Sequence, residues 1–232
     1  MPAQPAPGSG GPGASGPAPA QPPAEARQRW RLVFRRRADA PPLPQRDQTA
    51  AWEMALAGSG LRLVGLDLPV PRPRLVFAAP LVVGMAAERE LVDLYLVETR
   101  PVAEVRDRLA NALPAGHEAI DLYDVWLGEP ALSGRVVAAD YRVELSPGAD
   151  PRGAAADAGT LTRAAERLLA AGTIPRTRDK GGRTVAYDLR PLLAAIEVIR
   201  RPDDETRAGA LRVRTRFDPE RGVGRPDEVV AA

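Results

Sequence analysis

The chain has 232 residues, of which 44% are hydrophobic and 4% aromatic, and its 32 Lys and Arg against 30 Asp and Glu give a formal net charge of +2. Such a length suffices for one sizeable core or two small ones. The chain contains no cysteine, which excludes disulfides, thiolate metal sites, cysteine nucleophiles and protein-ligated iron–sulfur clusters. His117 is the only histidine and is expected at an exposed turn, so we expect neither a metal site nor a cofactor.

Residues 1–26 are rich in Pro, Ala and Gly and contain no Lys or Arg. A secretory signal needs a basic start and an apolar centre, and this segment has neither. Its composition cannot bury enough apolar surface to offset the entropy of ordering, so we expect a disordered leader. No apolar run approaches the roughly 20 residues that span a bilayer, which predicts a cytoplasmic protein with no membrane partner.

A first α+β unit is expected over residues 27–135. Residues 27–37 alternate with period two, which predicts a half-buried strand. One face of this strand carries Trp30, Leu32 and Phe34. The other face carries Val33 and four arginines: Arg29, Arg31, Arg35 and Arg37. The pattern then predicts a helix over residues 47–60, strands over 61–69, 73–83 and 89–99, a helix over 99–114 and a strand over 117–129.

A second unit, over residues 136–232, is expected to repeat this order. The pattern predicts a strand over residues 137–145, a helix over 160–172, a hairpin over 174–189 turning at Lys-Gly-Gly, a helix over 190–199 with a proline in its first turn, and a strand over 210–217. Two β-α-β-β-α-β units imply an α+β protein of two tandem ferredoxin-like units after the disordered leader.

The last predicted strand opens a stretch in which arginine alternates with apolar or small residues. Strand periodicity places Leu211, Val213, Thr215 and Phe217 on one face. It places Arg212, Arg214 and Arg216 on the other, as an exposed ladder.

Basic residues gather in two segments, with seven arginines in residues 27–46 and six in residues 207–225. If these segments form neighbouring strands of one surface, they make a patch that neutralises nucleic-acid phosphates. The candidate nucleic-acid contacts are Arg29, Arg31, Arg35, Arg37, Arg72, Arg74, Arg212, Arg214, Arg216 and Arg225. The alternative is a solvated sheet edge whose charge deters aggregation. Trp30 and Phe34 face away from these arginines, which argues against base stacking.

Two glycine-containing segments, RDKGGR and RGVGRPDE, offer backbone amides and cations to a phosphate. Neither matches a nucleotide-binding fingerprint, and tight turns are the favoured interpretation. Near the second segment lie the acids Asp218, Glu220, Asp227 and Glu228. Paired carboxylates can divide acid and base roles, but a closed pocket is not expected in a terminal, proline-containing segment, so we do not expect an enzyme.

Seven segments occur in the order RLVFRRR, PRPRLVFAAPL, ELVDLYL, LANALPAG, AADYRVEL, YDLRPLL and LRVRTRFDPERGVGRPDEVV. On these, from about residue 29 to the C-terminus, the chain resembles the radical SAM-associated (radical SAM-linked) family of uncharacterised bacterial proteins, in the stand-alone form that lacks the radical SAM domain. Two departures weaken the expectation of ligand binding: Gln45 stands where the family has a histidine, and residues 65–70 lack a Gly-Phe-Asn.

The resemblance implies a radical SAM protein as partner. Radical SAM catalysis needs three cysteines on a cluster, and this chain has none. We therefore expect a non-catalytic accessory protein that binds RNA or a ribosomal substrate through its arginines. The alternative is a protein–protein interaction module, in which the basic strands or the acidic residues 88–129 dock another protein.

Overall fold

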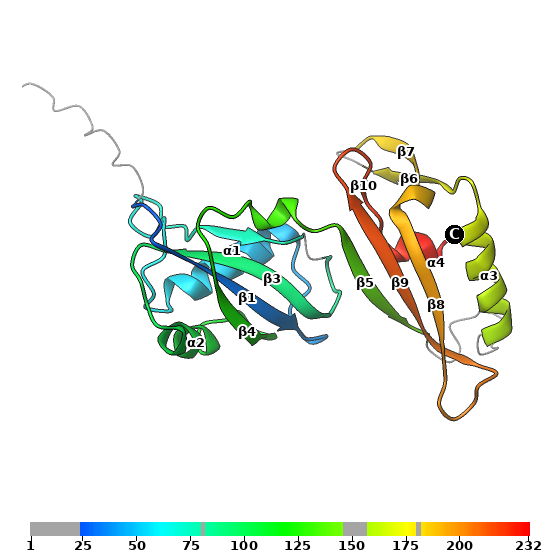
Figure 1. Cartoon of the computed structure of the whole chain (residues 1–232), viewed down its shortest axis with the longest axis horizontal. Coiled ribbons are helices and arrows are strands. Elements are labelled where there is room, and N and C mark those ends of the chain that lie inside the picture. The colour runs from blue at the N-terminus through cyan, green and yellow to red at the C-terminus, as the bar shows by residue number, and fades with distance from the viewer. Residues whose placement is uncertain (1–23, 80–81, 146–156, 180–181) are drawn as a thin grey trace, which may run out of the picture. The chain divides into compact units, whose positions relative to one another are not determined.

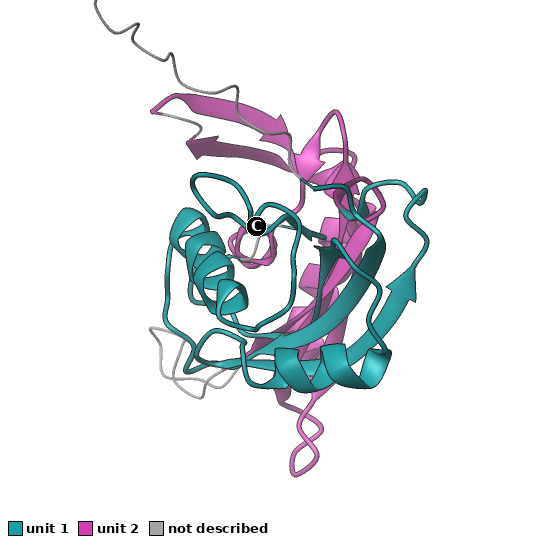
Figure 2. Ribbon diagram, turned by 90° about the vertical axis from the view of Figure 1, so that its left-hand side faces the viewer, with its two compact units in different colours: residues 1–132 teal, residues 133–232 magenta. Residues whose placement is uncertain are grey.

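The computed structural model describes residues 24–79, 82–145, 157–179 and 182–232. It divides into unit 1, residues 1–132, and unit 2, residues 133–232 (Figures 1 and 2). The expected leader lies outside the described residues, except for residues 24–26. No helix in the described part of the chain is long and apolar enough to cross a membrane.

Unit 1 has the element order expected of a ferredoxin-like unit. Its elements are β1 (Gln28–Arg36), α1 (Gln45–Ala57), β2 (Leu75–Phe77), β3 (Ala87–Leu96), α2 (Val102–Ala110) and β4 (His117–Val125), followed by the short 3-10 helix η1 (Leu132–Gly134). The sheet order is β2-β3-β1-β4 with every neighbouring pair antiparallel, which is the order of a split β-α-β unit.

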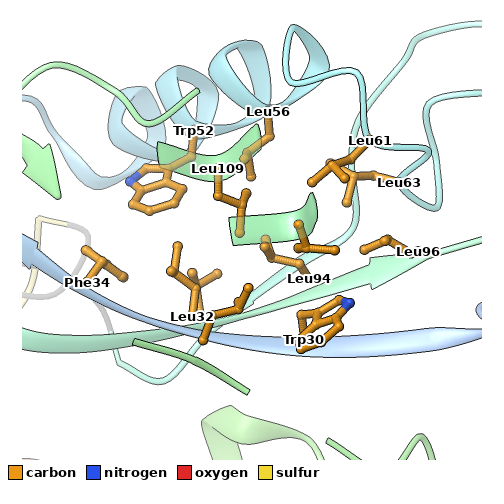
Figure 3. Close-up of a cluster of buried hydrophobic side chains, with 13 residues drawn as sticks. Trp30, Leu32, Phe34, Trp52, Leu56, Leu61, Leu63, Leu94, Leu96 and Leu109 are labelled. Carbon is orange, nitrogen blue, oxygen red and sulfur yellow. The ribbon is translucent and has the colours of Figure 1, made fainter. Parts of the chain in front are cut away.

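The core of unit 1 lies between its two helices and one face of this sheet (Figure 3). Trp30, Leu32 and Phe34 of β1 point into it, as their alternation predicts, and Trp52 of α1 packs with its ring centroid 4.7 Å from that of Phe34. Each large side chain buried in this way contributes roughly 1.5–3 kcal/mol.

The strand predicted over residues 61–69 is wrong. This segment forms turns and a single bridge from Leu63 to Leu96. Gly65 has φ +93° and its backbone lies so close to Arg72 that a Cβ would be 2.2 Å from the Arg72 carbonyl oxygen. The chain therefore turns sharply at a residue that only glycine fits, and the strand predicted over residues 73–83 is reduced to β2.

Unit 2 is built around a second antiparallel sheet. Its elements are β5 (Ala138–Glu144), α3 (Ala158–Ala170), β6 (Pro175–Asp179), β7 (Thr184–Asp188), the 3-10 helix η2 (Arg190–Leu192), β8 (Leu193–Arg200), β9 (Ala208–Asp218), β10 (Gly222–Val223) and α4 (Pro226–Val230). β9 pairs with β5 on one side and β8 on the other, and β10 pairs with the end of β9. β6 and β7 form a separate hairpin sheet.

The helix predicted over residues 190–199 is wrong. Pro191 begins only the single turn η2, and the chain then continues as strand β8. Ile196 and Val198 pack on the core while Glu197 between them is exposed, which is the period of a strand. β5, β8 and β9 thus pair as β1, β2 and β3 do in unit 1, and the β6–β7 hairpin is inserted between α3 and β8.

Candidate nucleic-acid interface

Strand β9 places alternate side chains on opposite faces of the unit 2 sheet, and the predicted alternation is confirmed. Leu211, Val213 and Thr215 are buried. The arginines between and after them are exposed. On the exposed side, β5 and β8 add charged residues in register with β9. We call this set the arginine face: Asp140, Arg142, Glu144, Glu197, Arg212, Arg214 and Arg216.

Carboxylates of the arginine face engage two of the three β9 arginines. Arg214 donates through Nε and Nη2 to the two oxygens of Asp140, at 2.8 and 2.7 Å, and this contact lowers the pKa of Asp140. Arg212 Nη1 lies 2.9 Å from Glu197 Oε2. All four side chains are at least half exposed, so these are surface ion pairs in contact with water.

Arg216 differs from its two neighbours on β9. Among the described residues it has no carboxylate partner, and its Nη1 donates instead to the main-chain carbonyls of Pro191 and Leu193, at 3.1 and 3.3 Å. Counting four arginines and three carboxylates, the arginine face carries a net charge of +1.

The expectation that Arg29 and Arg31 face solvent is wrong. Their residues are only 1% and 9% exposed, and both contact Asp93 of β3, which is fully buried. Arg29 Nε lies 2.8 Å from Asp93 Oδ2, and Arg31 Nε lies 2.7 Å from Asp93 Oδ1. The remaining Arg29 donors reach the carbonyl oxygens of Glu129 and Pro130, at 2.8 and 3.0 Å.

One carboxylate therefore holds two guanidinium groups between neighbouring strands, and its hydrogen bond raises the pKa of Arg31. A buried ion cluster of this kind is stable only when its members remain together, because a lone buried charge is costly. Arg29 and Arg31 are consequently structural cations of unit 1 in this conformation.

The other predicted contacts of unit 1 are exposed. Arg35 and Arg37 lie 3.5 and 3.6 Å from Glu118, and Arg37 also pairs with Asp39. Arg72 is exposed, and the Arg74 guanidinium carbon lies 4.1 Å from the centroid of the Tyr95 ring. In unit 2, Arg225 is exposed at the start of α4.

The two basic segments do not form neighbouring strands. β1 pairs with β3 and β4 in unit 1, whereas β9 pairs with β5, β8 and β10 in unit 2. The prediction that both basic segments lie on one sheet surface is therefore wrong. The predicted row of exposed arginines is present only on β9.

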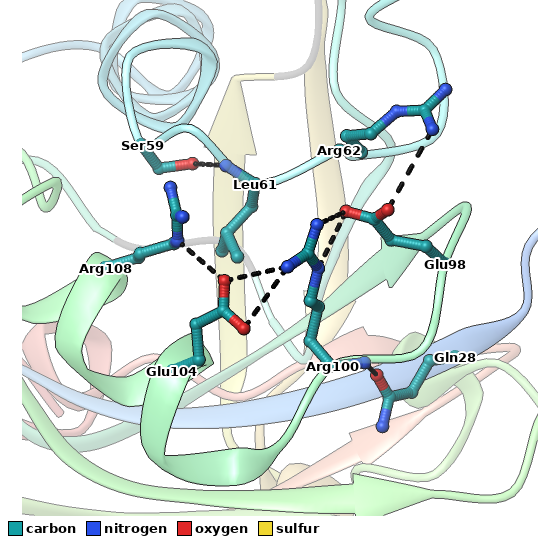
Figure 4. Close-up of polar contacts among 8 residues, drawn as sticks. All are labelled: Gln28, Ser59, Leu61, Arg62, Glu98, Arg100, Glu104 and Arg108. Atoms are coloured by element: carbon teal, nitrogen blue, oxygen red, sulfur yellow. Dashed lines mark hydrogen bonds and ion pairs between the residues drawn. The ribbon is translucent and has the colours of Figure 1, made fainter.

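The acidic residues 88–129 are partly neutralised within unit 1 (Figure 4). Arg100 contacts Glu98 at 2.7 Å and Glu104 at 3.1 Å. Glu104 also lies 3.2 Å from Arg108, one helical turn further along α2, and Glu98 lies 3.9 Å from Arg62. Two acids of this segment, Glu98 and Glu104, are thus already paired with arginines of the same unit.

His117 does not occupy an exposed turn. It is the first residue of β4 and half-buried, with its ring centroid 5.3 Å from that of Trp52. Burial lowers the pKa of His117. The sequence-based expectation was wrong because the aromatic ring of Phe34 and that of Trp52 extend the core to the end of this strand.

The sequence did not predict a polar cluster that lies in unit 2, although two segments that contribute residues to it, RDKGGR and RGVGRPDE, were singled out. Arg176 and Arg178 of β6, Tyr187 of β7 and Glu228 of α4 are each half-buried. Buried nitrogen or oxygen atoms on all four have no hydrogen-bond partner. Residues 180–181 of the RDKGGR segment, where a turn was predicted, lie outside the described residues, and beside them the Asp179 carboxylate accepts from the Gly182 amide at 2.9 Å.

The acids of the closing segment serve different roles. Asp218 accepts from the backbone amides of Glu220 and Arg221, at 2.9 and 2.8 Å, and these contacts lower its pKa. Burial instead raises the pKa of Glu228. Asp218 thus closes a turn over residues 219–221, whereas most of RGVGRPDE, predicted as a tight turn, forms β10 and the start of α4.

A family model described as an uncharacterised protein conserved in bacteria, DUF2344, matches residues 29–219. The matched residues extend from β1 to the turn after β9 and so include parts of both units. No curated protein matches the chain.

Proposed function

The chain belongs to the DUF2344 family of bacterial proteins, and on this premise we propose that it is a non-catalytic, cytoplasmic accessory protein that binds RNA through the arginine face of unit 2. The observation that carries the proposal is the β9 ladder, which presents Arg212, Arg214 and Arg216 to solvent along one strand.

The ion pairs on this face do not prevent phosphate binding. Each exposed arginine–carboxylate pair is worth only about 0–1 kcal/mol, so a phosphate can replace a carboxylate at little cost. Arg216 has no carboxylate to displace among the described residues. The three acids do reduce the net charge of the face, which favours weak, salt-sensitive binding over tight binding.

The arginine face contains no aromatic side chain on which a base could stack, and Trp30 and Phe34 are 3% and 0% exposed in the core of unit 1. We therefore propose recognition of the RNA backbone, with little sequence preference.

The test is the binding of a fluorescent, mixed-sequence RNA at several salt concentrations, comparing the wild type with R212Q/R214Q/R216Q. Because two of the three arginines already have carboxylate partners, the variant should flatten the salt slope by about one to three charges' worth. R167Q, in α3, is the control that removes a cation elsewhere in unit 2. An unchanged slope in the triple variant, or an equal loss in R167Q, would refute the proposal.

A second candidate function, protein–protein interaction, is favoured by the edge of β5. Within the described part of unit 2, β5 pairs only with β9, whereas its counterpart β1 in unit 1 has β4 on its other side. An unpaired strand edge can accept a strand from a partner.

A radical SAM protein is our proposed partner in either case, on the resemblance of the sequence alone. Co-purification of the chain with a radical SAM enzyme of the same bacterium tests this. Replacing Arg142 of β5 with proline removes a backbone donor and should weaken the complex only if this strand carries the contact.

A further inference from the structure

The hairpin of unit 2 turns its arginines toward the body of the unit. Along β6, Pro175, Thr177 and Asp179 are exposed, while Arg176 and Arg178 are half-buried. Residues two apart on a strand share a face, so these two guanidinium groups lie on one side of the hairpin. A surface hairpin would normally direct such residues to water, and their inward direction needs a reason.

The Arg178 guanidinium carbon lies 4.9 Å from the centroid of the Tyr187 ring, but a contact with a ring face leaves the N–H donors of both arginines to be satisfied. Within the described residues, Arg176 Nε and Nη2 and Arg178 Nε are buried and make no hydrogen bond, and neither residue forms an ion pair. Tyr187, opposite Arg176 in the hairpin, has a buried hydroxyl that is equally unpartnered. Each such group costs about 1–3 kcal/mol if left unsatisfied, so native proteins satisfy them with water or an ion.

One acid, Glu228, lies near the two cations and can balance only one of their charges. Glu228 feels the charges of Arg178 and Arg176, but its Oε2 is buried without a hydrogen bond, and burial raises its pKa. The cluster therefore combines two permanent positive charges with a single carboxyl group, and even an ionised Glu228 leaves a net positive charge. The excess positive charge of the cluster favours the binding of an additional anion.

The closing segment lies directly against this cluster. A Cβ on Gly222 would be 3.3 and 3.4 Å from the Arg178 Nη2 and Nη1 atoms, and Gly222 has φ +97°. A Cβ on Gly224 would be 2.7 Å from the carbonyl oxygen of Leu192 and 2.9 Å from Thr215 Cβ. The positive φ of Gly222 favours glycine there, and its backbone lies beside the Arg178 guanidinium group, while Gly224 packs the segment against Leu192 and Thr215.

We propose that Arg176, Arg178 and Tyr187 form a binding site for a phosphate group, bordered by Gly222 and Glu228. Two guanidinium groups supply planar sets of donors that match phosphate oxygens, and the tyrosine hydroxyl supplies a further donor. The site shares no residue with the arginine face, so it goes beyond the RNA-binding function proposed above. Its ligand is free inorganic phosphate or the phosphate of a nucleoside monophosphate.

The test is calorimetric titration of the full chain with inorganic phosphate and, separately, with uridine monophosphate, at constant ionic strength. We expect saturable binding that falls at least tenfold in R176Q and in R178Q, and a rise in affinity in E228Q, because the glutamine removes a competing negative charge. R167Q is the control, because it removes an exposed arginine of α3 that belongs neither to this cluster nor to the arginine face, and it should bind phosphate as the wild type does.

A second measurement covers the case in which an arginine variant fails to fold. Phosphate should raise the melting temperature of the wild type, and raise it further in E228Q, relative to chloride at the same ionic strength. Binding of both ligands assigns the site to phosphate monoesters as well, and binding of inorganic phosphate alone assigns it to the free ion. Binding of neither, unchanged binding in R178Q, or equal loss in R167Q would overturn the proposal.

Discussion

Replacing Asp93 with asparagine should destabilise unit 1 strongly. Asp93 is fully buried and its carboxylate accepts four hydrogen bonds, two from Arg29 and two from Arg31. Asparagine has nearly the same volume, but it carries no charge and directs an amide donor at the guanidinium groups. Removing one partner of a buried ion pair costs about 3–5 kcal/mol, and here it leaves two cations uncompensated. We expect a loss in this range.

Urea unfolding followed by tryptophan fluorescence measures this loss directly, because Trp30, Trp52 and Trp126 all lie in unit 1. For a slope of about 1–3 kcal/mol per molar urea, the midpoint should fall by roughly 2 M. E118Q is the control: Glu118 also contacts two arginines, but it is 43% exposed, and its loss should cost no more than about 1 kcal/mol.

The reasoning is refuted if D93N and E118Q lose the same stability. A further variant separates charge from packing. R29M/D93L/R31M removes all three charges together and should be far less destabilised than D93N, since a buried ion cluster can often be replaced by apolar side chains at little cost.

Two other changes test the backbone and the pH dependence of unit 1. G65A should cost about 1–3 kcal/mol, because its Cβ would meet the Arg72 carbonyl oxygen at 2.2 Å, whereas G84A, also at positive φ but with open space around its Cβ, should cost less; equal urea midpoints would contradict this. Burial raises the pKa of Glu90 from 4.5 to about 7, so the folded state binds the proton more tightly and stability should fall as pH rises between these values, by up to about 3 kcal/mol. E90Q should abolish this fall, and a fall that persists in E90Q would assign it to another group.

The sequence predicted the core face of β1 correctly but the exposure of Arg29 and Arg31 on its other face incorrectly, for one physical reason. Alternation shows which side chains share a face, but it does not show what covers that face. The residue that covers Arg29 and Arg31 is Asp93, more than sixty positions further along the chain. Only the pairing of β1 with β3 brings them together, and nothing local in the sequence encodes that pairing.

The error over residues 190–199 has a different origin. A proline at the start and a run of alanine and leucine have helical propensity. Pairing with β9 along nearly the whole of β8, interrupted by two register shifts, overrides this propensity. The sequence could not predict the polar cluster of unit 2, for the same reason that it could not predict the contacts of Asp93 with Arg29 and Arg31. The segments RDKGGR and RGVGRPDE each stood out as a turn, but the contact of Gly222 with Arg178 is tertiary.

The position of β9 in unit 2 has a consequence for synthesis on the ribosome. In unit 1, β1 emerges first, and both β3 and β4 pair with it as they follow, so that of the later strands only the short β2 must wait, for β3. In unit 2, β5 and β8 both pair with β9, which emerges last of the three. At about 5–20 residues per second, β5 waits several seconds for its partner, with its backbone donors open to other nascent chains.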